Sequence, residues 1–199
     1  MTRNCRGIPL AGMLLLPLLS IGMWQIGEGF WIYAKAELAQ LLLERAWSRA
    51  VAGKQEPRPW PWADTWPVAR LKHSRLGIDL IVLAGAGGHA LAFGPTHASG
   101  TSLPGSEGTT MLTGHRDTHF SFLRKLRAGD ILTVETPDRR TVDYVVQETA
   151  VLDSRTGAIA SDAIPRLALV TCYPFHAIAP GGPWRFVVMS EERRQMHPQ

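Results

Sequence analysis

A chain of 199 residues, of which 45% are apolar and 19% charged, is long enough for one globular domain and a short appendage. Its net charge of +4 comes from basic residues interleaved with acidic ones, and this lack of a basic stripe argues against a nucleic-acid partner. The two cysteines, Cys5 and Cys172, are too few for a disulfide framework or for a zinc cluster built on cysteine.

The beginning of the chain predicts a membrane anchor. The run Ile8–Ile26 holds no charged residue and approaches the ~20 apolar residues that a helix needs to cross a bilayer. Arg3 and Arg6 precede this run, so the positive-inside tendency predicts a cytoplasmic N-terminus over residues 1–7 and a transmembrane anchor over residues 8–27. We therefore expect a single-pass protein of the inner (cytoplasmic) membrane, in contact with lipid, whose remaining chain lies on the periplasmic or extracytoplasmic side. Cleavage as a signal peptide is the alternative, because a small-x-small sequence follows the run.

Residues 28–68 predict a juxtamembrane helix and then a connector. Ala34–Val51 is rich in Ala, Leu, Glu and Arg, with leucines at helical spacing, and Gly53 is a typical helix stop. The segment Gly53–Pro67 then alternates proline with tryptophan, which predicts an extended conformation. Its indoles either pack on the chain's own domain, the alternative that we favour, or form a ligand for another protein.

Residues 69–190 have the pattern of a mainly β domain, with short apolar runs separated by turn residues, and residues 191–199 predict a solvated tail. Seven or eight strands indicate a barrel or a sandwich. One short helix is expected near Phe120–Leu126, and the turn Thr136–Arg140 predicts an antiparallel hairpin. The expected strands are Ile78–Leu83, Ala90–Phe93, Thr109–Thr113, Ile131–Glu135, Thr141–Val151, Leu167–Thr171 and Arg185–Met189.

Three chemically capable residues stand at the ends of these runs. Cys172 follows Leu167–Thr171, His115 ends the run that begins at Thr110, and Arg185 opens the next strand. A free thiol is only slightly ionised near neutral pH, so a nucleophilic cysteine needs a base or a cation beside it. If the strands are neighbours, the three side chains meet at one edge of the domain. Each residue taken alone is equally compatible with a structural role.

A metal site is the competing use of His115. His115 and His119 are spaced four residues apart with Asp117 between them, which is one arrangement of zinc ligands. The glutamate of the HExxH pattern is absent, and no third ligand is evident in the sequence. We therefore expect no metal and no cofactor.

The ordered combination of these features resembles the sortase family over roughly Trp62 to Met189. The sequence Gly114–Phe120, the sequence ending in Thr171-Cys172 and the strand Trp184–Val188 follow each other as in sortases, after an N-terminal anchor. The phrases TGHRDTHFSFL and TCYPF are most similar to the Gram-negative branch, class GN, also called marine proteobacterial sortases. One departure is Ala168, which stands where the family signature before the cysteine begins with threonine.

This resemblance implies a closed eight-stranded β-barrel with short helices and a cysteine transpeptidase activity. By resemblance Cys172 is the nucleophile, His115 the general acid or base, and Arg185, rather than Arg116 next to the histidine, the residue that stabilises the oxyanion. The expected substrate is an LPxTG-like sorting signal of an exported protein, cleaved through a thioacyl intermediate and transferred to an amine acceptor.

We expect Thr171 and Phe93 to contact that peptide. Two other functions use the same features. One is an envelope L,D-transpeptidase or cysteine hydrolase, and the other is a non-catalytic, membrane-tethered binding module in which the connector recruits a partner.

Overall fold

The computed structural model describes residues 10–85, 88–157, 163–177 and 181–193, with side chains from residue 17 onward and at residue 15. The chain divides into two compact units, residues 1–40 and 41–199, which are described separately.

The helix α1 covers Leu10–Val51 and is continuous, so the helix expected over Ala34–Val51 is the second part of a longer one. It ends as predicted before Gly53, whose φ of +90° is a conformation that glycine adopts without strain. The N–H of Gly53 donates to Ala50 O at 2.9 Å and that of Lys54 to Arg49 O at 3.0 Å, which satisfies carbonyls of the last turn.

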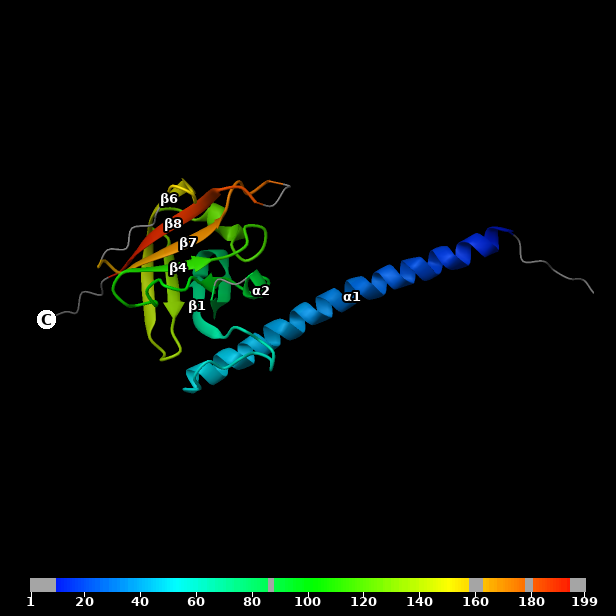
Figure 1. Ribbon diagram of the computed structural model, residues 1–199, viewed down its shortest axis with the longest axis horizontal. Helices are drawn as coiled ribbons and strands as arrows, with labels where there is room; N and C mark the ends of the chain where they lie inside the picture. The colour runs from blue at the N-terminus through cyan, green and yellow to red at the C-terminus, as the bar shows by residue number, and fades with distance from the viewer. Residues whose placement is uncertain (1–9, 86–87, 158–162, 178–180, 194–199) are drawn as a thin grey trace, which may run out of the picture. The chain divides into compact units, whose positions relative to one another are not determined.

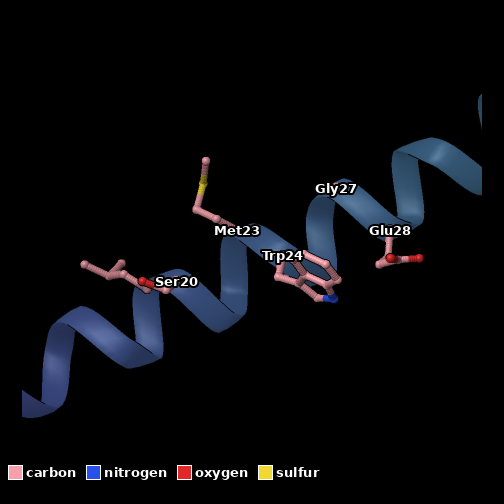
Figure 2. A pocket seen from close by; sticks show the side chains of 6 residues that line it. Ser20, Met23, Trp24, Gly27 and Glu28 are labelled. Atoms are coloured by element: carbon pink, nitrogen blue, oxygen red, sulfur yellow. The ribbon is translucent and has the colours of Figure 1, made fainter.

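The first unit presents apolar side chains to its surroundings along α1. In the described part of the chain, no helix has both the length and the apolar character needed to cross a membrane. The expected span begins at Ile8, and residues 1–9, including the expected cytoplasmic segment, lie outside the described residues. Figure 2 shows Met23 and Trp24 projecting from different sides of α1, around a shallow hollow beside Gly27 that is lined by this helix alone. Large apolar side chains that are more than half exposed here include Leu18, Leu19, Ile21, Met23, Trp24, Ile26 and Phe30.

The second unit is a closed barrel of eight strands in the order β1-β2-β3-β4-β7-β8-β6-β5 (Figure 1). This confirms the mainly β fold class and the closed eight-stranded barrel. All neighbouring strands are antiparallel except β2 with β3 and β4 with β7, which are parallel. The strands are β1 Pro67–His73, β2 Ile78–Ala84, β3 Thr96–His97, β4 Thr109–Thr113, β5 Ile131–Glu135, β6 Thr141–Asp153, β7 Arg166–Cys172 and β8 Trp184–Glu192.

The barrel interior is filled by side chains that alternate with outward-facing ones. In β1 every second residue is buried, as the two-residue period of a strand requires. The buried core includes Leu71, Val82, Leu112, Leu132, Tyr144, Leu169 and Val188. Short helical segments complete the unit, namely α2 Gly88–Leu91 and the 3-10 helices η1 Ser74–Leu76 and η2 Ser121–Lys125.

Most expected strands are present, and the hairpin at Thr136–Arg140 joins antiparallel β5 and β6 as predicted. The expected strand at Ala90–Phe93 is wrong, because this segment contains the end of α2 and a turn in which Phe93 N and Gly94 N donate to Ala90 O. A four-residue apolar run does not distinguish a strand from a helical turn. Strands β1 and β3 were not expected, and β8 continues to Glu192, two residues into the expected tail.

The connector packs on its own domain at Trp60, as expected. The Trp60 ring meets the Phe93 ring edge to face, with 4.9 Å between centroids, beside a small cluster that includes Leu43, Trp47 and Leu83. Trp62 differs, since 82% of it is exposed.

Candidate active site

Cys172 and Arg185 lie directly opposite each other on neighbouring strands. Cys172 is the last residue of β7, and the antiparallel register pairs it with Arg185 near the start of β8. Directly opposed residues share one face of a sheet. The preceding Thr171 is buried inside the barrel, so the alternation of side chains turns Cys172 to the outer face. Its free thiol is half-buried there.

His115 reaches the same edge from the other side of β7. Strand β4 runs parallel to β7 with Thr113 opposite Val170, and the N–H of Gly114 extends the pairing by donating to Val170 O at 3.2 Å. Parallel neighbours end at the same edge of a sheet. His115 and Cys172, each two residues beyond that pair, therefore leave adjacent strand ends, and His115 is exposed.

The backbone around His115 is held by contacts to buried residues. Thr171 Oγ1 donates to Gly114 O at 2.7 Å. Phe120, which is fully buried, donates its N–H to His115 O at 3.0 Å. A Cβ on Gly114 would lie 2.8 Å from the Phe120 ring, so only glycine allows this close approach. These contacts fix the backbone on both sides of His115.

The Arg185 guanidinium is anchored to the loop that precedes it. Its Nη1 atom donates to Gly182 O at 2.8 Å and to Trp184 O at 2.9 Å. Nη2 and Nε are the remaining donors of this side chain. Arg185 thus occupies the strand position opposite Cys172, with its guanidinium bound to the loop before β8.

A groove of about 450 Å³ extends from Arg185 across the outer face of β4, β7 and β8. Its floor includes Thr113, Val170 and Val187, which lie on the same face as Cys172. Apolar side chains with a few hydroxyl groups are the usual lining of a ligand groove. The full lining is Gly100, Thr101, Thr109, Met111, Thr113, Leu152, Ser154, Gly157, Val170, Arg185 and Val187.

The two residues expected to contact a peptide lie elsewhere. Thr171 points into the barrel and its hydroxyl is bound to Gly114 O. Phe93 packs against Trp60 in the cluster beside α1 and does not line this groove.

His119 lies close enough to His115 for their charges to interact. Burial lowers the pKa of His119, and the charge of His115 lowers it further. Both effects favour the neutral imidazole. In the described residues, no group of three or more histidine, cysteine, aspartate or glutamate side chains is arranged to hold a metal ion.

Arg116 lies closer to the site than the sequence indicated. It is buried, and it donates to two backbone carbonyls of the loop after Cys172. Its position next to His115 was the only signal in the sequence.

A family model described as the sortase domain matches residues 71–193, which is more than half of the chain. The chain belongs to the sortase family. The match begins within β1 and ends one residue after β8, so it covers nearly all of the barrel.

Solved sortase structures share this fold. Sortase C-1 from Actinomyces oris is 27% identical with a TM-score of 0.55, covering 65% of this chain and 76% of that one. A Clostridium perfringens sortase D5 transpeptidase is 19% identical with a TM-score of 0.63, covering 79% and 99%. Sortase A of Listeria monocytogenes is 23% identical with a TM-score of 0.57, covering 64% and 88%. Comparison with curated proteins finds no match.

Sortases are cysteine transpeptidases that act on sorting-signal peptides and amine nucleophiles. The edge formed by the ends of β4 and β7 and the start of β8 is therefore the candidate active site of this sortase.

Proposed function

We propose that this sortase is a membrane-anchored cysteine transpeptidase that cleaves an LPxTG-like sorting signal and transfers it to an amine. Cys172 is the nucleophile, His115 the general acid and base, and Arg185 the oxyanion-stabilising residue. The observation that carries the proposal is the register of three strands, which brings a free thiol, an imidazole and a guanidinium to one edge of the barrel.

The reaction runs in two steps at Cys172. In the first, the thiolate forms an S–C bond with the carbonyl carbon of the signal peptide, and Arg185 with nearby N–H groups binds the negative oxygen. The C–N bond then breaks, the departing amine takes a proton from His115, and a thioester remains. In the second step an acceptor amine, deprotonated by His115, attacks the thioester and releases the Cys172 thiolate, which restores the starting pair of thiolate and imidazolium. Water in place of the amine gives hydrolysis.

The groove beside Arg185 supports an extended peptide as substrate. Its lining offers Val170, Val187 and Met111 for apolar side chains of the peptide. A peptide in this groove would run along the outer face of β4 and β7 toward the Cys172 sulfur.

The anchor and the subtype are supported by the first part of the chain and by two motifs. The uncharged run Ile8–Ile26 and the exposed apolar side chains of α1 suit contact with lipid, with the catalytic unit on the periplasmic or extracytoplasmic side. The phrases TGHRDTHFSFL and TCYPF support assignment to class GN.

Flotation with liposomes, comparing the full chain with a chain that begins at Leu41, tests the anchor. If the shortened chain floats equally well, the first unit is not the anchor.

The activity is tested on the full chain in detergent micelles with an LPxTG-containing peptide and hydroxylamine as the acceptor. Mass spectrometry should detect the peptide hydroxamate and a trapped acyl adduct on the wild type. Cys172→Ala should give neither product, and the matched control Cys5→Ala should give both. Product from the Cys172→Ala variant, or no product from the wild type with any peptide of this class, would overturn the proposal.

A further inference from the structure

Arg116 is a buried cation between the two strand ends of the proposed site. Only 7% of the residue is exposed. Its Nη1 donates to Pro174 O at 2.9 Å and its Nη2 to Ala177 O at 2.7 Å. Its Nε lies 3.5 Å from a carboxylate oxygen of Asp117, a side chain that is 68% exposed.

Stability alone is a weak reason to bury this guanidinium. Removing a charge from water costs several kcal/mol, and a buried ionic group is often replaced by an apolar one without loss. The Asp117 carboxylate, 3.5 Å away, is mostly exposed, so solvent weakens its attraction to the guanidinium. The two short hydrogen bonds to carbonyls indicate that the side chain fixes the geometry of the loop after Cys172.

The two acceptors belong to one turn that begins just after Cys172. The N–H of Ala177 donates to Pro174 O at 3.3 Å, so the turn is closed by its own backbone and then bound by Arg116 at both ends. The donors of a guanidinium have a fixed fork geometry, so two carbonyls bound to it keep a fixed separation and orientation. A lysine ammonium cannot reproduce that fork.

Arg116 directly follows His115 in the chain. Its side chain holds the loop that directly follows Cys172, so one residue links the backbone at His115 to the backbone at Cys172. We propose that Arg116 is a positioning residue that fixes the Cys172 sulfur relative to the His115 imidazole. This inference rests on the proposed function, in which these two side chains act on the same bond of the peptide.

The test uses the full chain in detergent micelles, with Cys5→Ser in every variant so that Cys172 is the single thiol. The variants are Arg116→Lys, His115→Ala, their double mutant, and Arg75→Lys as the matched control. Arg75 also donates to a backbone carbonyl, Lys125 O at 3.1 Å, but on another part of the barrel. The readouts are kcat and KM for the LPxTG peptide, and the rate of Cys172 alkylation by iodoacetamide between about pH 5 and pH 9.

We expect Arg116→Lys to lower kcat by about ten- to a hundredfold with KM changed by less than about twofold, as a small misplacement of reacting groups does. It should also change the pH profile of alkylation, whereas Arg75→Lys should change neither. In the His115→Ala background, Arg116→Lys should have no further effect on alkylation, because there is no imidazole left to align.

If Arg116→Lys lowers the alkylation rate equally in the presence of His115 and in the His115→Ala background, the positioning role is overturned. A rise in KM at unchanged kcat would overturn it as well. Failure of Arg116→Lys to fold would assign the residue to stability and would also overturn it. Failure of the proposed function itself gives a different experimental result. In that case His115→Ala leaves alkylation and kcat unchanged, or Cys172→Ala still cleaves the peptide, and the positioning role falls with it.

Discussion

Replacing Thr171 by valine separates the two roles considered for this residue. The side chain is 3% exposed, and its hydroxyl donates to Gly114 O at 2.7 Å. Valine keeps the shape of threonine and puts a methyl group in place of the hydroxyl. The substitution therefore removes the donor to Gly114 O while leaving the barrel packing largely intact.

The expected loss follows from the burial of both partners. A buried acceptor left without its donor costs about 1–3 kcal/mol. We expect Thr171→Val to lower the free energy of unfolding by about 2 kcal/mol, which is about a 30-fold change in the folding equilibrium. Because Gly114 precedes His115, we also expect kcat to fall while KM for the peptide stays near its wild-type value.

A urea titration followed by tryptophan fluorescence measures the stability, and peptide cleavage measures kcat and KM. Thr171→Ser is the matched control, because it keeps the hydroxyl and should retain most of the hydrogen-bond contribution. An unfolding free energy for Thr171→Val within about 0.5 kcal/mol of the wild type would refute this reasoning. A rise in KM at unchanged kcat would instead favour the substrate contact expected from the sequence.

Four further substitutions test the end of β4, an ion pair and the connector. Gly114→Ala should lower the free energy of unfolding by about 1–3 kcal/mol in the same titration, since its Cβ has no room beside the adjoining buried aromatic ring; wild-type stability would contradict this. The pKa of Asp130 is lowered, chiefly by its hydrogen bond from Arg75, so this stabilisation is present above about pH 4 and is lost as the pH falls through the lowered value. Asp130→Asn should therefore lower Tm at neutral pH, with a difference that shrinks below about pH 4, and a constant difference would count against the ion pair. Trp60→Ala should destabilise by about 1–3 kcal/mol, whereas Trp62→Ala, at an 82% exposed position, should stay within about 0.5 kcal/mol; equal effects would contradict the packing of the connector.

The fold was predictable where local signals were strong. Thr109–Thr113 and Ile131–Glu135 have the predicted bounds because turn residues bracket short, β-prone runs. Strand β1 was missed because its buried positions include Ala69 and His73, which give a weak apolar alternation. At Ala90–Phe93 the apolar run was too short to distinguish the two secondary structures.

The candidate site was predictable only in its residue types. The sequence alone placed Cys172 and His115 at the ends of apolar runs, and the resemblance to sortases supplied their expected roles. Nothing local to these segments specifies that β4 and β7 are parallel neighbours, because strand pairing depends on contacts between residues far apart in the chain. The local sequence likewise does not specify that the buried Arg116 side chain binds carbonyls about 60 residues further along the chain.

The sequence by itself determined the mainly β composition of the domain, the helix that ends before Gly53 and the hairpin between β5 and β6. Each of these depends on backbone preferences and side-chain patterns within a few neighbouring residues. Only the tertiary structure decided which strand ends meet, that Thr171 faces inward while Cys172 faces outward, and that Arg116 holds the loop after the cysteine. Those features depend on closing the barrel, because closure sets the register that brings distant segments together.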